Sequence, residues 1–338
     1  MTATIGILLA TFNGAQFLQE QLDSIAAQSF EDWHLYARDD GSEDETGELL
    51  EDFALLHADR VTLLQDGDGR LGAAANFARL MATVKEPYIA FSDQDDVWHR
   101  TKLAVTLARL RILEADHGMH TPLMVHADRR LIDAEGREVT PSYWTSRRIR
   151  PHQFCYLESH YAFCFAAGST MLINQPLSDL AQRVPRGARM HDCWVELVAH
   201  AFGCVGWLEH PVLDHRRHGA NTSGARIESD APEARTFLRR AWRLFSDIDR
   251  QKAVYQGYFR QAEAFRQAFG DSLIPAERAR LEAFLAIPGQ PVLQRLASLL
   301  QSGCAPPGVL RSLILVWLSA GTLGIRDIDD ATPVRRAA

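Results

Sequence analysis

The feature that most constrains the fold is a regular alternation of short apolar runs and helix-like segments over the first hundred residues. The apolar runs have the length of strands that are buried on both faces of a sheet. The segments between them repeat apolar residues at helical spacing. This order predicts an α/β fold with a mainly parallel, doubly wound sheet and helices on both of its faces. The expected strands lie at about 5–10, 33–37, 61–64 and 88–91, and the expected helices at about 17–26, 45–57, 73–81 and 100–115.

Unusual polar residues follow these strands at the points where the strands end. Asn13 comes after the first strand, Asp39 and Asp40 come after the second, and Gly72 and Asp93 follow the third and fourth. In doubly wound sheets, ligands bind beyond the carboxyl ends of the strands. The sequence therefore predicts that these residues converge on one ligand-binding edge.

The run Asp93-Gln94-Asp95-Asp96 has the strongest chemical signature in the chain. Three carboxylates so close together repel one another unless they share a cation. An oxygen-only ligand set favours Mg²⁺ or Mn²⁺, and these ions commonly bind substrate phosphates in proteins. A helix N-terminus is the simpler alternative, because aspartate caps helices and suits the helix dipole. That alternative accounts for Asp96 but not for all three aspartates.

Four further segments allow both a functional and a structural interpretation. The first carboxylate of the run 39–46 can contact a nucleobase or ribose, although a polar turn is the simpler interpretation. The glycine-rich turn 67–72 lacks the spacing of known phosphate loops, so we expect a flexible turn. Asp192 is either a general base or a helix cap. The segment 215–218 either binds phosphate or a metal or forms a solvated basic turn.

Composition bounds the partners and the compartment. The chain has 338 residues, 46% of them hydrophobic, so it is long enough to form a large core without disulfides. Its formal net charge of −7 argues against a nucleic-acid-binding face. The five cysteines are scattered and form no C-x-x-C pair, so we expect reduced thiols in a cytoplasmic protein. No signal peptide is expected at the N-terminus.

The last third of the chain has a different pattern. From residue 231 onward the sequence is helical and rich in arginine, which predicts a helical appendage and two domains, at 1–228 and 229–338. The apolar stretch 312–325 is too short to span a membrane comfortably. We expect it to form a packed helix. The alternative is peripheral contact of residues 308–325 with the inner face of the plasma membrane.

Seven short motifs follow one another between residues 5 and 224, and they lie at 10–14, 39–42, 72–77, 92–98, 168–171, 190–194 and 216–221. In this order they resemble the motifs of the family 2 glycosyltransferases. The closest likeness is to the rhamnosyltransferase-like branch, which builds bacterial cell-surface polysaccharides such as O-antigen. The resemblance implies a GT-A fold with a Rossmann-like, mixed sheet.

The resemblance also implies roles for individual residues. Asp192 is implied as the catalytic base, and Asp95 and His218 as ligands of a divalent metal. The residues implied to bind the nucleotide-sugar are Thr11, Asn13, Asp39, Asp40, Asn76, Asp93, Gln94, Arg217 and His218. Those implied on the acceptor side are Trp98, Ser169, Thr170, His191 and Trp194. His215 and Arg217 replace the aromatic residue and the glutamine that are common in the last motif of the family.

The implied reaction moves a sugar, rhamnose by branch resemblance, from a dTDP- or UDP-sugar to a glycan or lipid-linked glycan acceptor. It proceeds with inversion and with Mn²⁺ or Mg²⁺ at the donor site. Two other classes are weighed against it. A phosphatase of the haloacid dehalogenase type would use Asp93 as a covalent nucleophile, but it leaves Asp39 and Asp192 without a function. A non-catalytic carbohydrate-binding protein would not require both Asp95 and Asp192.

Overall fold

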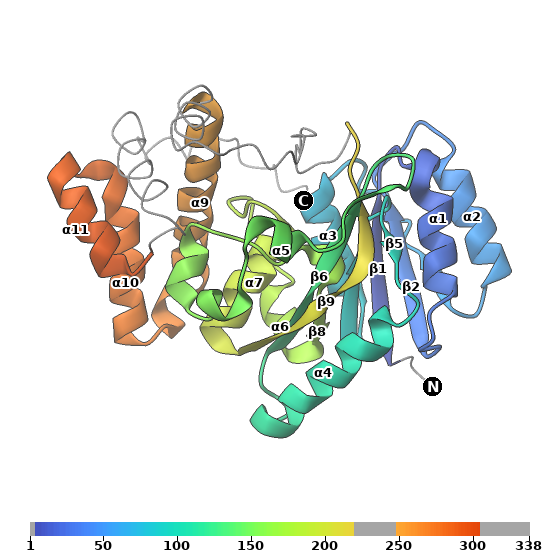
Figure 1. Ribbon diagram of the computed structural model, residues 1–338, viewed down its shortest axis with the longest axis horizontal. Helices are drawn as coiled ribbons and strands as arrows, with labels where there is room; N and C mark the ends of the chain where they lie inside the picture. The colour runs from blue at the N-terminus through green and yellow to red at the C-terminus, as the bar shows by residue number, and fades with distance from the viewer. Residues whose placement is uncertain (1–3, 220–247, 305–338) are drawn as a thin grey trace, which may run out of the picture.

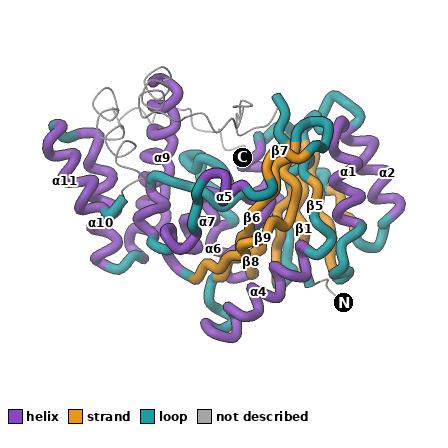
Figure 2. The backbone as a smooth tube through the Cα atoms, viewed as in Figure 1, coloured by secondary structure: helices purple, strands orange, loops and turns teal. Residues whose placement is uncertain are grey.

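The computed structural model describes residues 4–219 and 248–304, and one mixed sheet of nine strands lies at its centre (Figures 1 and 2). The strand order is β3-β2-β1-β4-β8-β6-β9-β5, and β7 pairs with β6 outside this path. The strands are β1 Ile5–Thr11, β2 Trp33–Asp39, β3 Val61–Leu63, β4 Tyr88–Ser92, β5 Val97–Trp98, β6 Leu123–Ile132, β7 Glu138–Thr140, β8 Leu172–Asn174 and β9 Cys204–Arg216.

The directions of the strands identify the edge of the sheet at which a ligand is expected to bind. Strands β1 to β4 are parallel to one another, so their carboxyl ends lie at the same edge. Strand β8 runs antiparallel to both β4 and β6. Strand β9 runs parallel to β6 along most of its length and antiparallel to β5 near its end. The predicted mixed, mainly parallel sheet is confirmed.

Helices cover both faces of the sheet, as predicted, because side chains alternate along each strand. In β1, Ile7 and Leu9 belong to a core with α1, α2 and α4, whereas Leu8 belongs to a core with α3, α6 and α7. The helices are α1 Ala15–Ala26, α2 Thr46–Leu56, α3 Ala73–Thr83, α4 Lys102–His117, α5 Tyr143–Arg147, α6 Gln175–Ala181, α7 His191–Phe202, α9 Ile248–Phe269, α10 Pro275–Ala286 and α11 Val292–Ser302.

The C-terminal helices extend the second of these cores, and Figure 1 shows them at one end of the molecule. Phe265 of α9 packs near Trp194 of α7, and Phe284 of α10 packs near Tyr161. The predicted helical region is therefore confirmed over 248–304. The expected domain boundary at 228 and the apolar stretch 312–325 lie outside the described residues. Among the helices that the structure describes, none is long and apolar enough to cross a membrane.

Three elements differ from the sequence-based expectation. The sequence also predicts a short strand at 123–126 and an irregular segment from residue 129, whereas strand β6 continues to Ile132. Strand β8 and the 13-residue strand β9 were not expected at all. Strand β9 carries exposed Glu209 and His210 in its middle and pairs with β6 through two register shifts. Long-range pairing, rather than a clean alternation of side chains, therefore stabilises it.

The expectation of five reduced cysteines is wrong for two of them. Cys164 and Cys193 form a disulfide, with a Cα–Cα distance of 5.3 Å and a sequence separation of 29 residues. The irregular segment before β8 folds over the start of α7 and brings the two thiols together, which their spacing in the sequence does not reveal. Cys155, Cys204 and Cys304 are free.

The pairing predicts a simple pattern of thiol modification. In the folded protein without reductant, a small alkylating reagent should label exposed Cys155 first and leave Cys164 and Cys193 unlabelled. After reduction and unfolding, mass spectrometry of the peptides should show both of the latter labelled. Labelling of Cys164 in the unreduced, unfolded chain would contradict the disulfide.

Candidate functional site

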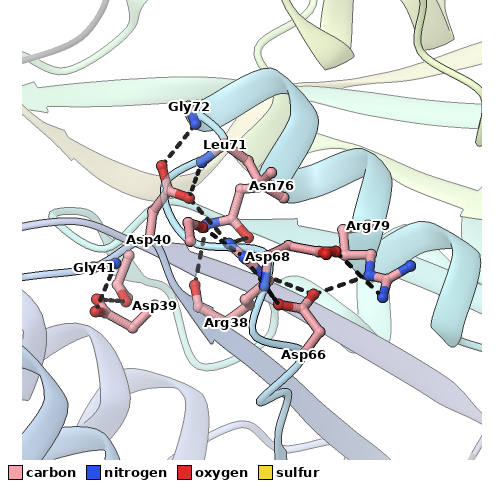
Figure 3. A network of polar contacts seen from close by, with 12 residues as sticks. Arg38, Asp39, Asp40, Gly41, Asp66, Asp68, Leu71, Gly72, Asn76 and Arg79 are labelled. Carbon is pink, nitrogen blue, oxygen red and sulfur yellow. Dashed lines mark hydrogen bonds and ion pairs between the residues drawn. The ribbon is translucent and has the colours of Figure 1, made fainter. Parts of the chain in front are cut away.

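A buried network of hydrogen bonds and ion pairs, centred on Arg38, lies at the carboxyl end of strand β2 (Figure 3). The guanidinium of Arg38 donates to both carboxylate oxygens of Asp66 at 3.0 Å and to Asp40 Oδ1 at 3.0 Å. Asp40 also accepts hydrogen bonds from the backbone N–H groups of Leu71 and Gly72, each at 2.7 Å. The hydrogen bonds from Arg38 hold the pKa of Asp66 below its usual value.

This network corrects one expectation and qualifies another. The glycine-rich turn 67–72 is not a freely flexible turn, because Asp40 and Arg38 bind its backbone. Asp40 therefore faces the turn, while the predicted residue Asn76 donates to the carbonyl of Arg38 at 3.1 Å. The roles of Asp40 and Asn76 in nucleotide binding stay predictions, and both side chains have a structural task at the same time.

A cavity of about 260 Å³ lies beside this network at the ends of β2 and β3. Asp39, Leu50, Leu64 and Asp66 are among its lining residues. The carboxylate of Asp39 accepts a hydrogen bond from Thr11 Oγ1 at 2.8 Å and from the N–H of Ser42 at 2.7 Å. The predicted residues Thr11 and Asp39 are therefore joined at the wall of a cavity that combines apolar and acidic surface.

The side chain of Gln94 connects the first turn of the site to the acidic run. Its Oε1 accepts from the N–H of Phe12 at 2.8 Å, and its Nε2 donates to the carbonyl of Phe12 at 3.0 Å. Gly14 is favoured beside it, because a Cβ atom at that position would lie 2.3 Å from Gln94 Cδ.

Asn13 adopts a left-handed conformation with φ of 47°, and its Oδ1 accepts a hydrogen bond from the N–H of Glu43.

The acidic run meets the end of β9. His218 Nε2 lies 2.8 Å from Asp95 Oδ2, and His215 Nδ1 lies 2.8 Å from Asp96 Oδ1. The interpretation of Asp96 as a helix cap is wrong, because strand β5 follows it and α4 begins only at Lys102. Asp96 is instead fully buried against His215.

The electrostatics of the run favour a bound cation. Burial, together with the charges of Asp96, Asp95 and Asp192, raises the pKa of Asp93 well above its usual value. Burial and the charge of Asp96 also raise the pKa of Asp95, against the hydrogen bond from His218. Both shifts arise mainly from burial, and the neighbouring negative charges add to them, so a bound cation would stabilise the ionised forms.

The pKa of Asp96 is shifted in the opposite direction from those of Asp93 and Asp95, although Asp96 is also buried. Burial alone would raise the pKa of Asp96, but the charge and hydrogen bond of His215 hold it below the usual value. Its Oδ2 atom is buried and has no hydrogen-bond partner among the described residues. Oxygen donors with uncompensated charge, and a histidine beside Asp95, fit a divalent metal ion at this place.

Asp192 lies in the first turn of α7, and the ring of the preceding residue, His191, lies 5.3 Å between centroids from the ring of Phe91, two residues before Asp93. Its Oδ2 accepts a hydrogen bond from the N–H of Gly168 at 3.2 Å, and its Oδ1 accepts from the N–H of Cys193 at 2.7 Å. Gly168 permits this approach, since a Cβ atom there would lie 2.8 Å from His191 Nε2. Asp192 is therefore a half-buried carboxylate that two backbone N–H groups hold in place.

Most of the residues predicted on the acceptor side lie inside the protein. His191 is stacked on Phe77 with ring centroids 3.8 Å apart. Trp194 is 1% exposed and contacts Phe265. The others, Trp98, Ser169 and Thr170, are also buried, as is Arg217 of the donor set. These buried side chains pack against other residues of the protein. Their expected contacts with substrates stay predictions.

Sequence reasoning missed several residues that shape the site. Lys102 is 1% exposed, and its Nζ lies 3.1 Å from the centroid of the Trp98 ring. Burial lowers its pKa well below the usual value, although Asp96 and Asp93 act in the opposite direction. Arg38, the centre of the buried network, was missed as well. Arg216, which belongs to the predicted segment 215–218, donates to the carbonyl of Asp95 at 3.3 Å. A lone lysine at a helix start has no motif, so no sequence signal could have found Lys102.

Comparison with known proteins identifies the family. The profile described as glycosyl transferase family 2 matches residues 7–175, which is half of the chain, so the protein belongs to this family. Two curated relatives are similar over part of their length. The dTDP-rhamnosyl transferase RfbG of Shigella flexneri is 38% identical over 98 residues, 28% of this chain and 34% of the relative. The putative glycosyltransferase EpsE of Bacillus subtilis is 32% identical over 107 residues, 31% and 38% of the two chains.

Each alignment thus spans little more than a third of the relative. Two solved structures share the fold over nearly the whole chain. TarS residues 1–349 of S. aureus, in complex with UDP-GlcNAc, gives a TM-score of 0.52 at 14% identity and covers 93% and 90% of the two chains. The mannosyltransferase PcManGT of Pyrobaculum calidifontis, in complex with GDP-Man and Mn²⁺, gives 0.52 at 15% identity and covers 98% and 89%. These likenesses show the GT-A fold.

The family assignment gives no support to the phosphatase alternative. That alternative also leaves Asp39 and Asp192 without a function.

The Arg38 network predicts a large difference between two arginines that bind the same carboxylate. Arg38 is 3% exposed and Arg79 is 46% exposed, and both donate to Asp66. Arg38→Met should lower the free energy of unfolding by about 3–5 kcal/mol, because it leaves buried Asp40 without a cationic partner and Asp66 with only the exposed Arg79. Arg79→Met is the matched control and should cost less than about 1 kcal/mol. Urea unfolding measures both, and equal losses would contradict the central position of Arg38.

Proposed function

We propose that the protein is an inverting, metal-dependent glycosyltransferase that moves a sugar from a nucleoside-diphosphate donor to a glycan acceptor. The observation that carries the proposal is the proximity of Asp192 to the acidic run. A carboxylate on the acceptor side and a cation-binding group on the donor side are the two parts that a single displacement requires. The family assignment and the donor-binding neighbours support the same class of reaction.

The donor would bind along the edge formed by β1, β2 and β4. We place its base in the cavity beside Asp39, because apolar Leu50 and Leu64 offer contact with a flat ring and Asp39 offers a hydrogen-bond acceptor. Asn13 and Asp93 would contact the ribose. The diphosphate would then lie toward Asp95, His218 and Arg217 at the end of β9.

A divalent metal at Asp95 and His218 would neutralise charge on the leaving diphosphate. The carboxylate of Asp95 and the imidazole of His218 would hold it, and we propose Mn²⁺ or Mg²⁺, with phosphate oxygens of the donor as further ligands. In this arrangement the pKa of Asp93 and of Asp95 falls when the ion binds, since each carboxylate gains an opposite charge.

Asp192 would accept the proton of the acceptor hydroxyl. A carboxylate with a solution pKa of about 4 is too weak to deprotonate a resting alcohol, so proton transfer must accompany bond formation. The N–H groups of Gly168 and Cys193 hold the carboxylate in place. Much of the rate would therefore come from the alignment of hydroxyl and anomeric carbon.

For the donor we propose a dTDP-sugar, with rhamnose as the sugar. The support is the likeness to the dTDP-rhamnosyl transferase RfbG over 98 residues. A UDP-sugar is the alternative. The acceptor would be a growing or lipid-linked glycan of a cell-surface polysaccharide, used at the cytoplasmic face of the membrane.

Asp192→Asn tests the base. The variant should transfer sugar about 100- to 10,000-fold more slowly, because the amide cannot accept the proton, while nucleotide binding stays normal. Asp179→Asn, on the exposed face of α6, is the control and should behave as the wild type. Transfer rates with a labelled donor measure both variants. Near-normal transfer by Asp192→Asn would show that another group acts as the base.

Thermal shifts test the donor and the metal together. A ligand that binds the folded state raises Tm in proportion to the logarithm of its concentration over Kd. With Mn²⁺ present, dTDP should raise Tm more than UDP or GDP, and Asp95→Asn should remove most of the shift. A chelator should abolish both the shift and transfer, and added Mn²⁺ or Mg²⁺ should restore them. Full transfer in the chelator would refute the metal's function.

A further inference from the structure

A second group of metal-binding side chains lies one helical turn beyond Asp192. Glu196 and His200 are four residues apart on α7 and therefore share one face of the helix. His160 approaches them from the short 3-10 turn Leu157–Tyr161. A carboxylate oxygen and one ring nitrogen from each histidine all lie within 4.8 Å of one another. None of these residues belongs to the proposed donor site.

The polar atoms of this group are buried and poorly satisfied. His160 and Glu196 are each 1% exposed. The Nδ1 atom of His160 and the Nε2 atom of His200 are buried, and neither has a hydrogen-bond partner among the described residues. Buried polar atoms in folded proteins nearly always have partners, so two unpartnered nitrogens in one cluster require an explanation.

The tautomer of His160 follows from its surroundings. Its Nε2 lies 2.9 Å from the backbone carbonyl oxygen of Phe154. A carbonyl oxygen only accepts hydrogen bonds, so Nε2 carries the proton and Nδ1 presents its lone pair to Glu196. A ring N–H held by a backbone carbonyl is the arrangement that orients metal-binding histidines.

The distance between His160 Nδ1 and Glu196 Oε1 is 3.4 Å. A protonated Glu196 that donated to this nitrogen would be expected nearer to about 2.5–3.0 Å. Two ligands of a tetrahedral zinc ion, with bonds of about 2.0–2.2 Å, lie about 3.3 Å apart. The backbone N–H groups of Phe165 and Ala166 hold the carboxylate at this position, at 3.2 and 3.4 Å.

We propose that His160, Glu196 and His200 bind a zinc ion, at a site separate from the donor metal at Asp95. Two imidazoles and one carboxylate favour zinc over Mg²⁺ or Mn²⁺, which prefer oxygen ligands. The rings of His160 and His200 are stacked with centroids 3.8 Å apart, so they must turn apart to point at one ion.

The ion fastens the irregular segment 154–166 to α7. The same helix carries Asp192 in the preceding turn, and the disulfide from Cys164 to Cys193 joins the same two segments. The zinc therefore acts as a structural cross-link that supports the position of Asp192, without contact with substrate.

The test begins with the full-length wild-type protein. After dialysis against a weak chelator, elemental analysis should find about one zinc per chain, and added Zn²⁺ should raise the Tm of stripped protein. X-ray absorption at the zinc edge should show nitrogen and oxygen neighbours at about 2.0–2.2 Å and no sulfur at about 2.3 Å. This measurement needs no variant, so it remains informative if a substitution prevents folding.

Variants then locate the ion. Glu196→Gln and His200→Asn should each lose the bound zinc and the Tm rise with Zn²⁺. Asp95→Asn, which alters the donor site, and Asp179→Asn, on the exposed face of α6, are controls that should retain both. A folded wild type that binds no zinc would overturn the proposal. Sulfur neighbours, or zinc retained in both Glu196→Gln and His200→Asn, would also overturn it.

Discussion

The repulsion among Asp93, Asp95 and Asp96 is the constraint on which the rest of the site depends. Three carboxylates at a strand end are unfavourable without compensation, and the fold supplies it from a strand more than a hundred residues away. The antiparallel register that pairs Val97 with Asp214 brings the next residues, Asp96 and His215, together. Strand β9 thereby belongs to the sheet and also carries His215, whose charge and hydrogen bond hold the pKa of Asp96 below its usual value.

The neighbouring residues Asp39 and Asp40, at the end of β2, also have different surroundings, because their side chains point in different directions. Asp39 lies at the wall of the cavity, whereas Asp40 turns inward to Arg38 and the backbone of the glycine-rich turn. One aspartate is available to a ligand because the other fixes the surrounding loop. A buried arginine that binds two carboxylates thus anchors the backbone of a loop whose residues are mostly exposed.

The sequence allows the first half of the fold and the convergence of polar residues at the ends of its strands to be predicted, because strands β1 to β4 and their helices follow local rules of periodicity. Residues at the ends of these strands were placed correctly for the same reason. Strand β9, the partnership of Asp96 with His215 and the Cys164–Cys193 disulfide could not be predicted. Each depends on contacts between distant segments, and neither propensity nor spacing carries that information. Lys102 and Arg38 were missed because a buried charge looks like a surface charge in a sequence.

The contact of Gly14 with Gln94 has a consequence for how sequences of this kind can vary. The two residues occupy one small volume, and Gln94 uses it to hold both backbone groups of Phe12. A larger residue at position 14 requires a smaller one at position 94, and that exchange would release the first turn of the site. The residues at positions 14 and 94 are therefore expected to covary across related sequences, although one lies in the first turn of the site and the other in the acidic run.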